Sequence, residues 1–168
     1  MAGFDSYKVL TEVVIDNYQY KVTWSSASGE SCILWIRDSQ VMEHFEALGR
    51  FLDFDKRHIL EFIIRYSTNS LFREEISKRR FIKYLDKLSP TLFEDIERLS
   101  YQEKVRAFQN LYNLDSILDV YLDLGWKRKI LARKFHPDFG GDNRKMALIN
   151  EGYEVLMESL TKDETKGR

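Results

Sequence analysis

Cysteine, proline and glycine are all scarce in this chain of 168 residues. The one cysteine, Cys32, has no second cysteine in the chain to pair with, which excludes an internal disulfide and leads us to expect the reducing cytoplasm. Eight glycines and two prolines supply few helix breakers. This shortage favours long helices over a sandwich of many short strands.

Long apolar runs and an excess of one charge are also absent. No stretch approaches the roughly 18 apolar residues of a membrane-spanning helix, and the first six residues lack the charged and apolar regions of a secretory signal. We therefore expect no membrane partner. The 26 basic and 27 acidic residues nearly cancel, so the chain has no overall positive field for nucleic acid, and none is predicted as a partner.

The motifs of enzyme active sites are missing as well. The sequence contains no Gly-rich phosphate loop, no nucleophile motif and no metal-ligand spacing, and His44 and His58 stand fourteen residues apart without nearby ligands of that kind. We predict no catalytic residue, no metal and no cofactor. The protein is expected not to be an enzyme.

Apolar residues are plentiful, at 43% of the chain, and are arranged first as strands. Residues 9–15 are rich in β-branched side chains, residues 18–24 alternate apolar and polar, and residues 32–36 form a short apolar run. Short connections between them predict an antiparallel meander, whose apolar face needs a covering layer.

From residue 39 the apolar spacing becomes helical. Val41, Phe45, Leu48 and Leu52 predict a helix with Ser39 as its N-cap. Further helices are expected around 59–66 and over 71–88, and Pro90 suits the first turn of a fourth. With the sheet, these helices predict an α+β module of unknown role over residues 1–100.

A basic run lies on the third of these helices. Its cations are interleaved with Glu74, Glu75 and Asp86, at spacings that allow helical ion pairs. This pattern favours a solvated helix face over a nucleic-acid patch. The cations are Lys78, Arg79, Arg80, Lys83 and Lys87.

The later part of the chain predicts a helical hairpin. Pro137 ends the first helix, Gly140 and Gly141 allow the chain to reverse, and Asp142 or Asn143 can cap the second helix. Each helix carries an apolar stripe, so the two pack antiparallel and present the intervening loop at their tip. The stripes are Ile117, Val120, Tyr121, Leu124, Leu131 and Phe135, and then Met146, Ile149, Tyr153, Met157 and Leu160.

The first of these two helices is strongly basic. Residues 127–134 contain five bases and no acid, with Lys129 and Arg133 opposite the stripe and Lys127 and Lys134 flanking it. Such a face attracts an acidic partner over a reach of roughly 8 Å at physiological salt.

Residues 102–160 resemble the J domain of DnaJ-type co-chaperones. The family combines a basic helix, a His-Pro-Asp tripeptide, a Gly-Gly-Asp-like loop and a helix of defined pattern. The matching residues here are His136-Pro137-Asp138, Gly140-Gly141-Asp142, Met146, Ile149-Asn150, Tyr153 and Leu156.

The resemblance implies a co-chaperone that docks on a DnaK-type ATPase, the 70 kDa heat-shock chaperone, and stimulates its ATP hydrolysis. The module at residues 1–100 would then select an unknown client or a location, the J-like domain would span 101–160, and residues 161–168 would form a frayed tail. The residues that it assigns to partner binding are His136, Pro137, Asp138, Lys127, Lys129, Arg133 and Lys134.

Some positions depart from the family pattern. Lys127 and Arg128 replace Ala-Tyr, so Arg128 falls on the apolar stripe and must snorkel, pair with Glu154 or Asp123, or contact another element. Gly152 replaces Ala, at a cost of up to about 1 kcal/mol in a helix. The family's first helix corresponds best to residues 103–113; the alternative is 116–124, ended by Gly125.

Four apolar residues point away from the hairpin's own stripe, which leaves two interpretations. They pack on the amino-terminal module, or they form a secondary interface for another protein. The departures likewise keep a second function open, a J-like interaction scaffold without chaperone stimulation. The four residues are Trp126, Ile130, Leu148 and Val155.

Overall fold

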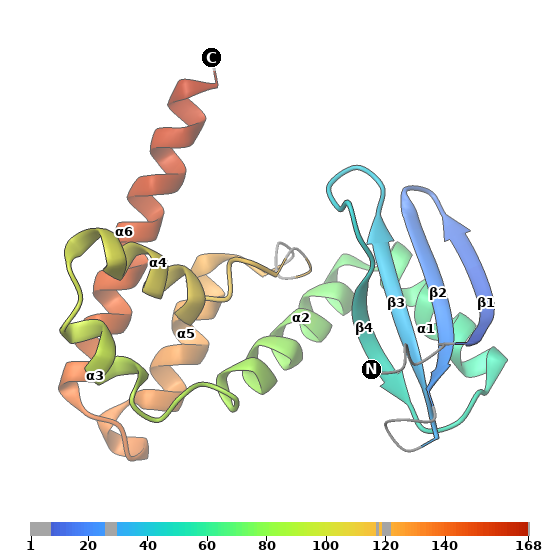
Figure 1. Cartoon of the computed structure of the whole chain (residues 1–168), viewed down its shortest axis with the longest axis horizontal. Helices are drawn as coiled ribbons and strands as arrows, with labels where there is room; N and C mark the ends of the chain where they lie inside the picture. Colours follow the sequence, from blue (N-terminus) through green and yellow to red (C-terminus); the bar gives the residue numbers. More distant parts are fainter. Residues whose placement is uncertain (1–7, 26–29, 117, 119–121, 168) are drawn as a thin grey trace, which may run out of the picture. The chain divides into compact units, whose positions relative to one another are not determined.

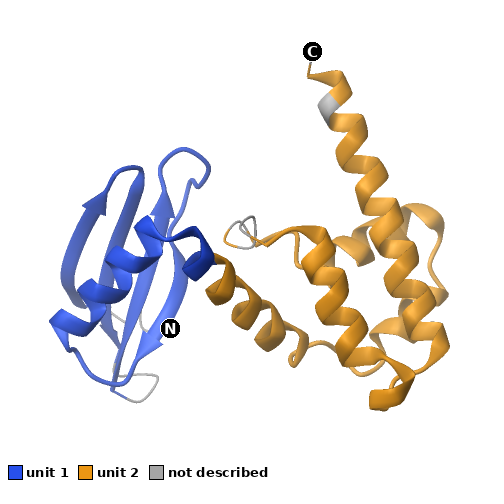
Figure 2. Ribbon diagram, turned by 180° about the vertical axis from the view of Figure 1, so that it is seen from behind, with its two compact units in different colours: residues 1–73 blue, residues 74–168 orange. Residues whose placement is uncertain are grey.

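The computed structural model has an α+β fold, in which a four-stranded antiparallel sheet is followed by helices (Figure 1). It describes residues 8–25, 30–116, 118 and 122–167. The chain forms two compact units, Met1–Arg73 and Glu74–Arg168, coloured separately in Figure 2. The α+β class predicted from the sequence is confirmed.

The sheet of the first unit is a meander with the strand order β1-β2-β3-β4. Strands β1 (Lys8–Ile15), β2 (Tyr18–Ser25) and β3 (Ser31–Asp38) confirm the three predicted strands. Asp16 takes a φ of 53° in the tight turn between β1 and β2, a conformation that Asp tolerates better than most residues.

The predicted helix over 39–52 is wrong, because residues Glu46–Phe51 form strand β4. Ser39 does not cap a helix; its backbone N–H donates to the Asn17 carbonyl at 2.9 Å. Leu48 lies in the core because β4 pairs with the exposed edge of β3, and that pairing overrides the local helical spacing.

Helix α1 (Lys56–Thr68) covers one face of the sheet, as Figures 1 and 2 show from opposite sides. Asp55 begins it by accepting the backbone N–H groups of Arg57 and His58. Ile59 and Ile63 bury its apolar side, and the Tyr20 hydroxyl lies 2.6 Å from Ser67 Oγ. Burial of Tyr20 raises its pKa to about 12, so its hydroxyl stays protonated in this contact at neutral pH.

The second unit is helical. It contains most of α2 (Ser70–Leu85), then α3 (Leu92–Glu97), α4 (Tyr101–Leu111), α5 (Leu124–Phe135), the short 3₁₀ helix η2 (Pro137–Phe139) and α6 (Asn143–Lys166). One core joins them: Phe81, Leu85, Phe93, Ile96, Phe108, Leu111, Tyr112, Leu122, Leu124, Leu131, Leu148, Ile149 and Leu156.

The boundary between the units lies earlier than the seam predicted near residue 100. Phe81 of α2 and Phe93 of α3 bury their rings in the same core as Phe108 of α4 and Leu131 of α5. The helices between residue 74 and residue 100 therefore belong to the second unit.

The carboxyl-terminal tail also differs from the prediction. The sequence predicted a frayed tail from residue 161, but α6 continues to Lys166.

The basic run on α2 is solvated only in part, because Arg79, Lys83 and Lys87 are exposed whereas the Lys78 side chain is 21% exposed and lies over the Trp126 ring. Lys78 pairs with Glu74 at 2.7 Å, and Arg79 pairs with Glu75 at 3.3 Å, both at a spacing of four residues. Across the part of the chain that the structure describes, no helix is long and apolar enough to cross a membrane.

Candidate functional site

The loop between α5 and α6, residues 136–142, is the apex loop. His136 has φ −63° and ψ 143°, the extended conformation that a following proline imposes, and Pro137 begins η2. The His136 side chain is 44% exposed and that of Asp138 is 80% exposed. Both groups are therefore accessible to another molecule.

Hydrogen bonds within the apex loop fix the orientation of the imidazole. His136 Nδ1 accepts the Asp138 backbone N–H at 3.2 Å, and the Asp138 carboxylate lies 3.3 Å from the same nitrogen. The loop thus presents the imidazole and the Asp138 carboxylate side by side.

Two glycines allow the loop to close. Gly140 has a φ of 87°, which favours glycine, and the Gly141 N–H donates to the His136 carbonyl at 3.0 Å. A Cβ on Gly141 would stand 1.6 Å from the Phe135 carbonyl oxygen. Asp142 then caps α6 by accepting the Lys145 N–H at 2.8 Å. Asp142, not Asn143, is therefore the cap.

Phe139 is a feature of the apex loop that sequence reasoning missed. Its side chain is 70% exposed, and its ring centroid lies 6.4 Å from that of His136. An aromatic residue directly after His-Pro-Asp was the available signal, but an apolar residue in sequence does not reveal whether it points outward.

Helices α5 and α6 run in opposite directions from this loop. Phe135, at the end of α5, lies beside Lys145 near the start of α6, with the ammonium 5.8 Å from the ring centroid. Earlier on α5, Arg128 lies over Tyr153 in the middle of α6, at 4.6 Å. Leu131 and Ile149 are fully buried in the shared core.

The cations predicted to form one basic face are divided by the structure. Lys129 and Arg133 are exposed on α5, as expected. Lys134 forms an ion pair with Asp86, in the turn that follows α2. Lys127 is 1% exposed, so its assignment to the partner-binding face is wrong.

Lys127 is buried because its ammonium group meets the carboxyl end of α4. Nζ donates to the Tyr112 carbonyl at 2.8 Å and lies 3.4 Å from the Asn113 carbonyl. A helix end presents such carbonyls with partial negative charge, which favours a cation. Phe81 borders the site, its ring centroid 5.4 Å from Nζ.

Tyr112, whose carbonyl accepts from Lys127, also makes a hydrogen bond to α6. Its hydroxyl donates to the Ile149 carbonyl at 2.7 Å, and burial raises the pKa of the phenol well above its usual range. The phenol is therefore a permanent donor at neutral pH. Together, Lys127 and Tyr112 join α4, α5 and α6 through polar contacts inside the apolar core.

Arg128 is exposed, so its predicted place on the apolar stripe is wrong. Of the outcomes expected for it, contact with another element is the one observed, as its guanidinium lies over the Tyr153 ring. The helix phase is set by Leu124, Lys127 and Leu131, whose spacing of three and four puts residue 127, not 128, toward the core.

The four residues assigned to a secondary interface differ in exposure. Leu148 is 5% exposed and lies in the core with Phe93 of α3, so its place in an interface is wrong. Ile130 and Val155 are partly buried against the same core. Trp126 is 38% exposed, and the Lys78 ammonium lies 3.6 Å from its ring centroid. Three of the four therefore pack on the protein's own helices.

Gly152 makes room for α4. A Cβ at this position would come within 2.7 Å of the Phe108 ring, which is fully buried. The small residue that departs from the family pattern thus allows close packing of α4 on α6.

We expect Gly152→Ala to destabilise the protein by about 1 kcal/mol. Overpacking a core costs about 1–3 kcal/mol, which outweighs the gain of about 1 kcal/mol from helix propensity. Urea unfolding measures the change. In the double variant with Phe108→Leu the loss should shrink, and equal losses with and without that second change would contradict the steric explanation.

Helix α4 coincides with the segment favoured as the family's first helix, and the capping box of Ser100 and Glu103 begins it. Gly125 lies inside α5 and ends no helix, so the alternative that ends a helix there is wrong.

The stripe residues Ile117, Val120 and Tyr121 lie outside the described residues. Met157 and Leu160 are exposed, although they were predicted to lie on the apolar stripe of α6.

Within the described ranges, no group of three His, Cys, Asp or Glu side chains lies together as metal ligands would. Comparisons with protein-family models, with curated proteins and with solved structures gave no match for this chain.

Proposed function

We propose that this protein is a cytoplasmic J-domain co-chaperone, which docks on a DnaK-type chaperone and stimulates its ATP hydrolysis. The exposed apex loop carries the proposal, because it holds His136-Pro137-Asp138 in a fixed conformation between two packed helices. The first unit would select the client or the location.

Docking needs no catalytic group on this chain. The apex loop offers the imidazole and the Asp138 carboxylate for hydrogen bonds, while exposed Lys129 and Arg133 on α5 attract an acidic surface. Such charges raise the rate of encounter and set the orientation of the partners. The chemistry of hydrolysis would belong entirely to the ATPase.

We expect wild-type protein to raise the single-turnover ATPase rate of a DnaK-type chaperone, and His136→Gln to lower this stimulation by at least about tenfold. Loss of a central interface contact has effects of this size. His44→Gln is the matched control, because His44 is an exposed histidine of the first unit, and it should stimulate as the wild type does.

Equal activity of the His136→Gln and His44→Gln variants would contradict the proposal. The alternative is a J-like interaction scaffold without chaperone stimulation. One observation favours it: with Lys127 buried and Lys134 paired to Asp86, the basic face is narrower than predicted. A complex that survives His136→Gln but is lost with Trp126→Ala would identify the scaffold.

A further inference from the structure

A hollow of about 300 Å³ lies between the segment that follows α2 and the ends of α5 and α6. All of its walls belong to the second unit. We call it the α3–α5 hollow. Its lining is Leu85, Asp86, Leu88, Ser89, Pro90, Leu92, Phe93, Lys134, Phe135 and Lys145.

Polar and apolar atoms contribute about equally to the exposed lining of the α3–α5 hollow, and the apolar part is formed by leucine and phenylalanine side chains. Leu85 and Phe93 are buried, and the Phe93 ring meets the Phe135 ring edge to face, with centroids 4.8 Å apart. Leu88 and Leu92 are partly buried against the same core. A volume near 300 Å³ is at the lower end of ligand pockets and suits one or two large apolar side chains.

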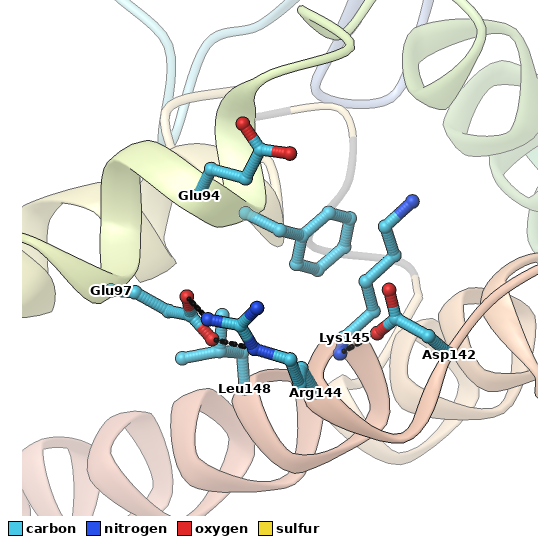
Figure 3. A pocket seen from close by; sticks show the side chains of 7 residues that line it. Glu94, Glu97, Asp142, Arg144, Lys145 and Leu148 are labelled. Atoms are coloured by element: carbon cyan, nitrogen blue, oxygen red, sulfur yellow. Dashed lines mark hydrogen bonds and ion pairs between the residues drawn. The ribbon is translucent and has the colours of Figure 1, made fainter.

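The rim of the hollow is basic at the point nearest the apex loop. The Lys145 ammonium lies 5.7 Å from the Phe93 centroid and 5.8 Å from the Phe135 centroid. Figure 3 draws a neighbouring pocket that shares Phe93 and Lys145 with the hollow and is also lined by Glu94, Glu97 and Asp142. In this view Lys145 extends away from the ion pair in which Arg144 Nε donates to Glu97 at 3.1 Å. Among the described residues Lys145 makes no ion pair, whereas Lys134 is held by Asp86.

We propose that the α3–α5 hollow binds a linear segment of the ATPase partner, in which a large apolar side chain stands next to Asp or Glu. The apolar side chain fills the space over Phe93 and Phe135, and the carboxylate pairs with Lys145. The inference rests on the proposed docking at the apex loop, because Phe135 and Lys145 flank that loop on either side.

The hollow lies partly outside the J-like segment. Leu88 and Leu92 come from residues before 101, so the resemblance to the J domain does not cover the part of the chain that closes the site. The turn after α2 and the start of α3 would thereby contribute to partner choice, in addition to their packing role.

The test uses full-length protein and three fluorescein-labelled peptides, with sequences Ser-Phe-Leu-Asp-Glu-Ser, Ser-Phe-Leu-Lys-Lys-Ser and Ser-Ser-Ser-Asp-Glu-Ser. We expect the first to bind most tightly by fluorescence anisotropy and to shift the methyl NMR signals of Leu88 and Leu92. Lys145→Glu should weaken binding by about fivefold or more, as loss of a partly exposed charge pair does. Lys162→Glu, an exposed charge farther along the same helix and outside the lining, should leave it unchanged.

Equal binding of the three peptides, unshifted Leu88 and Leu92 signals, or equal affinity of the two lysine variants would each overturn the inference. ATPase stimulation that depends on His136 but is indifferent to Lys145→Glu would also overturn it, while leaving the proposed function intact. Peptide binding at the hollow without ATPase stimulation by the wild type would instead refute the proposed function, and with it the identity of the partner.

Discussion

Lys127→Ala is expected to lower the free energy of unfolding of the second unit by about 3–4 kcal/mol. Truncating a buried long side chain leaves a cavity, which costs about 2–5 kcal/mol in protein cores. The variant also leaves the Tyr112 carbonyl without the donor that Nζ supplies at 2.8 Å, and an unsatisfied buried acceptor costs about 1–3 kcal/mol. These contributions overlap, since the cavity admits water to the carbonyl.

A methionine at the same position separates packing from charge. Lys127→Met restores most of the volume but donates no hydrogen bond, so we expect about half of the loss to be recovered. Lys129→Ala is the matched control on the same helix, and because Lys129 is exposed its effect should stay within about 0.5 kcal/mol. Urea unfolding followed by far-ultraviolet circular dichroism measures all three. A Lys127→Ala loss no larger than that of Lys129→Ala would contradict the burial of Lys127.

Lys127 also shows why the partner-binding face was predictable only in part. The basic composition of α5 and the exposure of Lys129 and Arg133 follow from helical periodicity. Periodicity placed Arg128 on the apolar stripe and Lys127 beside it, whereas the structure buries Lys127 and exposes Arg128. Which of the two faces the core depends on the carboxyl end of α4. There the carbonyls of Asn113 and Tyr112, which lie fourteen and fifteen residues before Lys127 in the chain, contact its Nζ. No local pattern contains that contact.

Strand β4 illustrates the same limit in the fold. The spacing of apolar residues over 39–52 fits a helix as well as a short strand, and Leu48 is buried in the strand that forms. The open edge of β3 decides between them, because its backbone N–H and C=O groups need a partner. Strands β1 to β3, by contrast, were predictable, because β-branched residues, alternation and short connections all indicate strands there.

The apex loop was the most predictable part of the candidate site. Its proline, its two glycines and its capping aspartate each restrict the backbone locally, and the structure uses all of them within seven residues. The pairing of Lys134 with Asp86 and the outward position of Phe139 were not predictable, since they depend on how α2 and the loop lie around the end of α5.

Gly141→Ala is expected to disrupt the apex loop and to destabilise the second unit by about 3 kcal/mol or more. The added Cβ would stand 1.6 Å from the Phe135 carbonyl oxygen and 2.2 Å from its carbon, and a backbone group cannot move aside as a flexible side chain can. The loop must open instead, which breaks the hydrogen bond from the Gly141 N–H to the His136 carbonyl. The lost hydrogen bond and the backbone strain together place the expected loss of stability near the top of the range for single substitutions.

Gly140→Ala is the matched control for this prediction. It has no atom within 4 Å of its added Cβ, and only its φ of 87° opposes the substitution, so a loss of about 1–2 kcal/mol is expected. Thermal unfolding gives the stability of both variants, and amide NMR shifts of residues 136–142 report the loop itself. If opening the loop displaces His136, Gly141→Ala should also abolish ATPase stimulation at temperatures where the protein remains folded, whereas Gly140→Ala should retain it. Native-like loop shifts in Gly141→Ala would contradict the steric argument, because the observed backbone leaves no space for that methyl group.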